Sequence, residues 1–176
     1  PYPLKAMIAT AGNPAVIVPD SKRFVEALKK LELKATMDLF MTETAHLSDY
    51  VLPACSFIET TGIGAWPTGA IHGVPYISIR PKVIEPVGES WADWKIWSEL
   101  GRRMGYDEVF PWKEDEEVTK TLLQPCGIPY EELKKHPEGM YLPKKYYLYK
   151  EIGFGTRTGK VELYSEAFKA LGFDPI

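Results

Sequence analysis

The first forty residues combine two short apolar runs with an amphipathic stretch between them. The apolar run at 4–10 predicts a buried strand, and Gly12 and Pro14 then interrupt regular structure. A helix capped by Asp20 or Ser21 is predicted over 22–31, where four apolar residues share one face: Phe24, Val25, Leu28 and Leu31. A second strand is predicted at 33–37. Strand, helix and strand with short connections predict two parallel strands joined by a right-handed crossover.

The stretch from 37 to 62 continues this pattern, and the rest of the chain is organised around it. A short helix is expected to begin at Thr42 or Thr44, and a third short strand at 50–52 is stopped by Pro53. A strand end, a short helix, a strand and a glycine-bearing loop are typical of the ligand-facing edge of an α/β sheet.

The second half of the chain is more helical. A loop with Trp66 is predicted over 62–73, and an extended segment over 76–84. Ser90 is expected to cap a helix over 91–104, with a buried stripe made of Trp94, Trp97, Leu100 and Met104. Shorter elements are predicted after it: a helix at 114–123, a short amphipathic turn or helix at 130–135, a strand at 161–164 and a last helix capped by Ser165. The fold class predicted is α/β, a three-layer Rossmann-like, doubly wound and mostly parallel sheet with helices on both faces.

Composition and charge exclude several classes of function. The chain has 176 residues, of which 45% are apolar and 26% charged, and its formal net charge is −3. These values are ordinary for a globular domain and do not favour binding to nucleic acid or to an anionic membrane. No apolar run approaches the ~20 residues that span a bilayer, so direct membrane insertion is not expected.

The cysteines and histidines show no metal-binding spacing. Cys55 and Cys126 are far apart, and the three histidines have no ligand spacing with them. The chain does not begin with Met, so we expect it to be a piece of a longer polypeptide. The compartment, cytoplasmic or periplasmic, is therefore not predicted.

Two predicted loops leave the carboxyl ends of the first two strands, at 11–14 and 38–43. Ligands of doubly wound sheets bind at such ends. An acid after the second strand, here Asp38, can hold ribose hydroxyls or accept hydrogen bonds from the N1–H and N2–H₂ groups of guanine. The phosphate-binding G-x-G-x-x-G pattern is absent after Gly12, which argues against a standard NAD site. On shape alone, a turn-forming role for Asp38 is equally favoured.

Five ordered segments resemble one protein family: 12–14, 38–45, 48–62, 86–94 and 156–166. The set is similar to the molybdopterin oxidoreductases of the dimethyl sulfoxide reductase type, and it spans nearly the whole chain. The resemblance implies that residues 1–150 are the third, dinucleotide-binding-like domain of a larger catalytic subunit. Residues 151–176 would then begin the segment that leads into the C-terminal domain.

The resemblance also implies a cofactor and its contacts. The cofactor is molybdopterin guanine dinucleotide carrying Mo or W, and this domain would hold its guanosine and pyrophosphate end. The expected contacts are Asn13, Met37, Asp38, Thr60 and Asp93. Thr60 stands where some members carry a lysine that contacts the cofactor.

Each expected contact also has a structural alternative. Without the resemblance, Asp93 is better explained as an acid at the third position of a helix capped by Ser90. Asn13 can form a turn, and Glu43 and Asp49 are expected to have structural roles.

The remaining parts of such an enzyme are expected elsewhere. The metal ligand and the cysteines of an iron–sulfur cluster would lie in other domains, so no catalytic or metal-binding residue is assigned to this chain. The partners implied are the remaining domains of the same subunit and an iron–sulfur electron-transfer subunit. Two other hypotheses stay open: a cofactor-free scaffold in a redox complex, and an independent binder of NAD or another nucleotide.

Overall fold

The computed structural model describes residues 2–64 and 75–176. The predicted loop around Trp66 lies outside these residues from position 65 onward. Contacts divide the chain into two units, Pro1–Met140 and Tyr141–Ile176, which we describe separately. None of the helices described is both long enough and apolar enough to cross a membrane.

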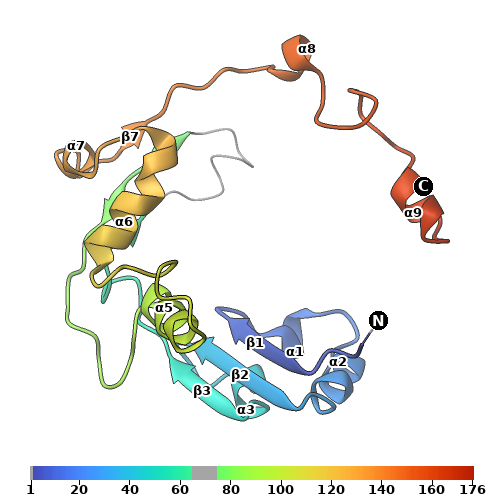
Figure 1. Cartoon of the computed structure of the whole chain (residues 1–176), viewed down its shortest axis with the longest axis horizontal. Coiled ribbons are helices and arrows are strands. Elements are labelled where there is room, and N and C mark those ends of the chain that lie inside the picture. The colour runs from blue at the N-terminus through green and yellow to red at the C-terminus, as the bar shows by residue number, and fades with distance from the viewer. Residues whose placement is uncertain (1, 65–74) are drawn as a thin grey trace. The chain divides into compact units, whose positions relative to one another are not determined.

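The first unit contains a three-stranded parallel sheet (Figure 1). Its strands are β1 (Ala6–Thr10), β2 (Leu33–Asp38) and β3 (Tyr50–Pro53), in the order β1-β2-β3. Ile8 pairs with Ala35, which in turn pairs with Tyr50. The predicted strands and their parallel pairing are confirmed.

Three helices connect these strands: α1 (Pro14–Ile17), α2 (Ser21–Leu28) and α3 (Glu43–His46). The side chain of Asp20 caps α2 by accepting from the Arg23 N–H, and Thr42 caps α3 by accepting from the Ala45 N–H. Side-chain caps therefore begin α2 and α3, whereas α1 has none. The short helix α1 was not predicted.

The two faces of the sheet pack against different helices. Thr36 is fully buried on one face, and its hydroxyl is hydrogen-bonded at 2.7 Å to that of Ser48, which follows α3. Ala35 and Leu52 point to the other face, because successive strand residues alternate sides. There they line an apolar cavity of about 450 Å³ together with Ile96 of α5 (Asp93–Arg103). The α/β fold class is confirmed.

Helix α5 begins later than the sequence indicated. Trp91 is extended and forms a parallel bridge with Ala54, so it cannot belong to the helix. The Ser90 hydroxyl donates to the Val87 carbonyl instead of capping α5. Ala92 is the N-cap and Asp93 the first helical residue. The predicted cap at Ser90 is wrong, because pairing with a distant strand overrides a local signal.

The buried positions of α5 also differ from the predicted stripe. Ser98 and Gly101 are buried, whereas Trp97 and Leu100 are partly exposed and Met104 is 65% exposed. A Cβ at Gly101 would lie 2.2 Å from the ring of Phe110. The helix therefore packs Gly101 against the ring of Phe110, while Ile96, Trp97 and Leu100 line the apolar cavity beside the sheet.

The rest of the first unit forms a second small core. Strand β4 (Gly62–Ile63) pairs antiparallel with β6 (Ile79–Arg80). The other elements are β5 (Tyr76–Ile77), α6 (Asp115–Leu123), the 3₁₀ helix η1 (Gln124–Cys126) and α7 (Tyr130–Lys134); the short strand β7 (Met140–Tyr141) includes the last residue of this unit and the first of the next. Leu123 and Leu133 have 1% and 0% of their surface exposed. The helix predicted at 114–123 is confirmed, and the segment at 130–135, predicted as a turn or a helix, is a helix.

The second unit has little regular structure. It contains α8 (Tyr149–Ile152) and α9 (Glu166–Ala170), and the Ser165 hydroxyl caps α9 as predicted. The strand predicted at 161–164 is wrong, since these residues form no strand. No residue of this unit is buried.

Candidate functional site

A cavity of about 300 Å³ lies where the three parallel strands end. Its walls come from the segments that follow β1, β2 and β3 and from the first residue of α5. The lining residues are Ala11, Gly12, Asn13, Met37, Asp38, Leu39, Phe40, Ala54, Cys55 and Asp93. The structure therefore brings four of the five predicted contacts, all except Thr60, to one hollow at the expected edge of the sheet.

Asp38 ends β2 and combines two roles. Its Oδ1 accepts a hydrogen bond of 3.2 Å from the Phe40 N–H, as a turn-forming aspartate does. Its backbone carbonyl accepts from the Ala54 N–H at 3.2 Å, which extends the pairing with β3. The described residues give Oδ2 no hydrogen-bond partner. A carboxylate has about four acceptor positions, so Asp38 keeps acceptors for a ligand.

Asp93 reaches the cavity through a non-local contact. The Cys55 N–H donates to the Trp91 carbonyl at 2.9 Å, and the Trp91 N–H donates to the Pro53 carbonyl at 3.0 Å. These bonds place the start of α5 beside the end of β3. Asp93 has no hydrogen bond or ion pair with the described residues, and partial desolvation raises the pKa of its carboxyl. The helix cap that would have explained Asp93 locally does not form.

The Asn13 side chain is largely occupied by α3. Its Nδ2 donates to Glu43 Oε2 at 2.6 Å, and its Oδ1 accepts from the Thr44 N–H at 3.2 Å and from the Thr44 hydroxyl at 2.7 Å. One N–H of the amide remains for a ligand. Asn13 therefore joins the loop after β1 to α3, and Glu43 has the structural role expected of it.

This link makes a prediction about pH. The hydrogen bond from Asn13 lowers the pKa of the Glu43 carboxyl below its ordinary value of 4.5. A group with a lowered folded-state pKa stabilises the fold above its unfolded pKa, and the contribution is lost as pH falls through the folded value. We expect Glu43→Gln, whose neutral amide still accepts from Asn13, to lose less stability than the parent between about pH 6 and pH 3. Urea midpoints at both pH values measure this, and an equal decline in both proteins would contradict it.

Met37 lines this cavity and also the apolar cavity beside the sheet, but it is deeply buried. Only 1% of Met37 is exposed, and its sulfur accepts a hydrogen bond of 3.6 Å from the Thr10 hydroxyl. Its carbonyl accepts from the Ala11 N–H at 3.1 Å. Any contact of Met37 with a ligand would therefore be limited to a small part of its surface.

Thr60 does not line this cavity. Its hydroxyl is buried and has no hydrogen-bond partner among the residues the structure describes. A cofactor contact at Thr60 stays a prediction.

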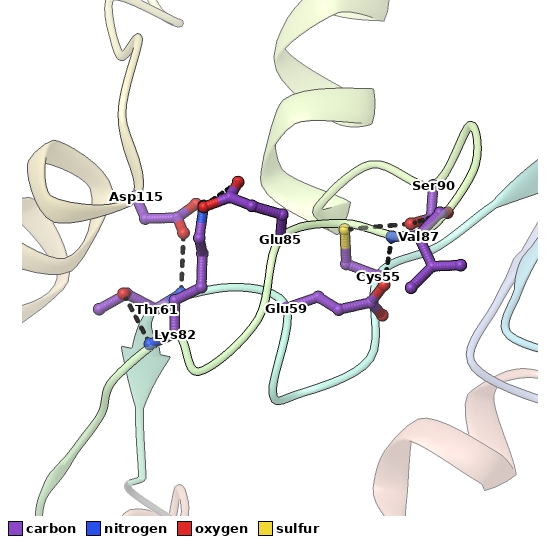
Figure 2. A network of polar contacts seen from close by, with 8 residues as sticks. All are labelled: Cys55, Glu59, Thr61, Lys82, Glu85, Val87, Ser90 and Asp115. Atoms are coloured by element: carbon purple, nitrogen blue, oxygen red, sulfur yellow. Dashed lines mark hydrogen bonds and ion pairs between the residues drawn. The ribbon is translucent and has the colours of Figure 1, made fainter.

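Sequence reasoning missed two residues of the cavity wall, Phe40 and Cys55. Phe40 is 73% exposed, and its ring offers an aromatic surface at the edge of the hollow. Cys55 donates to the Ser90 hydroxyl at 3.7 Å (Figure 2), and burial raises the pKa of its thiol. Phe40 lies within the loop predicted at 38–43 but was not singled out, and applying the strand-end rule to β3 as well would have found Cys55.

The charge of the cavity limits what it can bind. Its lining contains the carboxylates of Asp38 and Asp93 and no Lys, Arg or His. Carboxylates suit the N–H donors of a base and the hydroxyls of a ribose, but they repel phosphate. The start of α1 offers no phosphate site either, because Pro14 lacks an N–H and the Ala15 N–H donates to the Thr44 hydroxyl at 3.1 Å. The geometry therefore fits a nucleoside better than a pyrophosphate.

No metal centre is visible in residues 2–64 and 75–176. No group of three or more His, Cys, Asp or Glu side chains in these ranges could hold a metal ion. The free thiols are those of Cys55 and Cys126.

Comparison with known proteins gives consistent matches. A family model described as "Molybdopterin oxidoreductase" matches residues 2–103. The chain is 36% identical to acetylene hydratase of Syntrophotalea acetylenica, over 100% of this chain and 24% of the relative. It is 29% identical to the thiosulfate reductase molybdopterin-containing subunit of Salmonella typhimurium, over 97% of this chain and 25% of that subunit.

A solved structure matches as well. Acetylene hydratase from Pelobacter acetylenicus superposes with a TM-score of 0.76 at 34% sequence identity, covering 100% of this chain and 24% of that one. The chain thus spans about a quarter of the length of these relatives.

Proposed function

This chain belongs to the molybdopterin oxidoreductase family, and we propose that it holds the guanosine end of one molybdopterin guanine dinucleotide. The proposal rests on one observation: Asn13, Asp38 and Asp93, from three separate segments, line a single cavity at the carboxyl ends of parallel strands. Residues 1–150 would form the binding domain, and 151–176 would begin the segment leading into a C-terminal domain.

The chemistry of the cavity fits guanosine. Guanine presents two neighbouring donors, N1–H and N2–H₂, and a carboxylate accepts both at once. Asp38 retains acceptor positions for this, and Asp93, which has no described partner, can accept from ribose hydroxyls. Phe40 can stack on a base, an interaction worth about 1–3 kcal/mol. Thr60 remains a candidate contact outside the cavity.

This domain would bind the cofactor and orient it. When bound, the pterin dithiolene and its Mo or W supply redox chemistry. Within this chain, Asp38 and Asp93 would fix the far end of the cofactor, and Asn13 and α3 would hold the wall on which it lies. We propose that the whole subunit is a Mo- or W-dependent oxidoreductase. Its metal ligand and an iron–sulfur cluster would lie in other domains, and an iron–sulfur subunit would exchange electrons with it.

Calorimetric titration tests the binding proposal. We expect the chain to bind guanosine and GDP and to show no heat with ADP, whose base has an acceptor at N1 and no amino group at C2. Affinity should be modest, because the other domains would complete the binding site. Equal heats with GDP and ADP would contradict the proposal. Quenching of tryptophan fluorescence by NADH but not GDP would favour the alternative of an independent NAD-binding domain.

A cofactor-free scaffold is the second alternative. The carboxylates of Asp38 and Asp93 line one cavity and keep acceptor positions that no described residue occupies, which favours a binding site over a scaffold. Metal analysis of a full-length subunit distinguishes the two: absence of both molybdenum and tungsten would favour the scaffold.

A further inference from the structure

Glu59 is a buried acid directly behind one wall of the cavity. It is 7% exposed, and both carboxylate oxygens accept hydrogen bonds; Figure 2 shows the one from Val87. Oε2 accepts from the Ser56 N–H and the Ser56 hydroxyl, both at 2.6 Å, and Oε1 accepts from the Val87 N–H at 2.6 Å. Burying an ionised carboxylate is costly unless hydrogen bonds compensate for it, and three donors do so here. These bonds, those from Ser56 foremost, lower the pKa of Glu59.

The hydrogen bonds of Glu59 join two segments that both reach the cavity. Ser56 follows the lining residue Cys55, and Val87 begins the segment that leads to Asp93. Two further hydrogen bonds join the same two segments: Cys55 Sγ donates to Ser90 Oγ at 3.7 Å, and Ser90 Oγ donates to the Val87 carbonyl at 2.8 Å. The backbone bonds of Trp91 with Cys55 and Pro53 bring Asp93 beside the end of β3, and the network around the Glu59 carboxylate braces the two segments on either side of that bridge.

A second acid anchors the other end of the loop. Asp115 Oδ2 accepts from the Thr61 N–H at 2.7 Å, and its Oδ1 accepts from Trp94 Nε1 at 2.6 Å (Figure 2 shows the bond to Thr61). The loop after β3 is thus fixed at Thr61 independently of Glu59. Loss of the Glu59 carboxylate should loosen the cavity wall while the loop stays attached.

We propose that Glu59 is a positioning residue for the proposed guanosine site, holding Cys55 and Asp93 in one wall without touching the ligand. This inference rests on the proposed function, but the geometry of the wall can be tested separately. An amide cannot replace this carboxylate, because one of its two ends is a donor and would face an N–H group.

The test compares Glu59→Gln with Glu117→Gln. The Glu117 carboxylate also accepts from two backbone N–H groups, those of Lys113 at 2.6 Å and Glu114 at 3.3 Å, in the capping box of α6. None of these residues lines the cavity. The two variants make the same chemical change, one at the wall and one away from it.

Two readouts separate positioning from general stability. We expect Glu59→Gln to weaken GDP binding about tenfold by calorimetry. In a Cys126→Ser background it should also raise the rate at which iodoacetamide alkylates Cys55, measured by mass spectrometry. Glu117→Gln should change the melting temperature and leave both readouts at the parent values.

The outcomes are distinct. Parent-like GDP affinity and parent-like Cys55 alkylation in Glu59→Gln would overturn the inference. If the parent itself does not bind GDP, the proposed function fails, and the Cys55 rate alone decides whether Glu59 holds the wall. If Glu59→Gln does not fold, Ser56→Ala replaces it, since it removes one of the three donors to the carboxylate. It should weaken GDP binding about threefold and speed alkylation, and no change in either would overturn the inference.

Discussion

Replacing Asp38 with asparagine is expected to weaken GDP binding roughly 10- to 100-fold and to create affinity for xanthosine diphosphate. Hydrogen bonds to a charged group contribute about 1.5–3 kcal/mol each, and the substitution removes one acceptor that faces guanine. Xanthine has a carbonyl where guanine has its amino group, so the asparagine amide can donate to it. The turn is preserved, because the amide oxygen can still accept from the Phe40 N–H. Calorimetric titration of the parent and of Asp38→Asn with GDP and with xanthosine diphosphate measures this change in nucleotide preference.

A matched control is available at Asp20. Its carboxylate caps α2 by accepting from the Arg23 N–H at 3.3 Å, and it does not line the cavity. Asp20→Asn should leave the affinity for both nucleotides unchanged. Equal heats of GDP binding for the parent and Asp38→Asn would remove Asp38 from the proposed site.

The second large effect concerns stability. Leu122 and Leu123 are neighbours in α6, yet 60% of Leu122 is exposed and 1% of Leu123. We expect Leu123→Ala to lower the free energy of unfolding by about 2–5 kcal/mol, because it leaves a cavity in the second core. Leu122→Ala should cost less than about 1 kcal/mol.

Urea unfolding followed by tryptophan fluorescence measures both values. Trp112 is a suitable reporter, since its Nε1 donates to the Thr121 hydroxyl of α6 at 2.9 Å. Similar losses in the two variants would show that α6 does not bury the face that the structure assigns to it.

The order of the early elements could be read from the sequence because their signals are local. The apolar runs predict β1 and β2, and single residues next to the helices, Asp20 and Thr42, supply the caps. The ordered motifs carried the family resemblance, and the match over residues 2–103 confirms it.

Helix α5 shows where local reasoning fails. Ser90 has the right chemistry for a cap, but Trp91 pairs with Ala54 at the end of β3, and that contact spans a long stretch of chain. The stripe of tryptophan and leucine residues was predicted to be buried, but Trp97 and Leu100 are partly exposed. Gly101 is buried instead, because the ring of Phe110 lies against it. Tertiary packing decided both outcomes, and periodicity contains no information about it.

The location of the candidate site could be predicted from the sequence, but the hydrogen bonds that hold its residues in place could not. Parallel strands end at one edge, so a cavity shared by Asp38 and Asn13 followed from topology. The hydrogen bond from Asn13 to Glu43 and the one from Val87 to Glu59 each join residues from separate segments of the chain. Such pairings depend on how the loops fold, which local patterns do not report.

The two charged residues that line the cavity are both acidic, and this has a consequence for how binding would respond to dissolved salt. Attraction between a phosphate and a lysine weakens as ionic strength rises, because dissolved ions screen it. Recognition of a neutral base and sugar by Asp38 and Asp93 involves no such attraction. Potassium chloride would therefore leave the affinity for free guanosine nearly unchanged, and the electrostatic work of holding the cofactor's anionic part would fall to other parts of the protein.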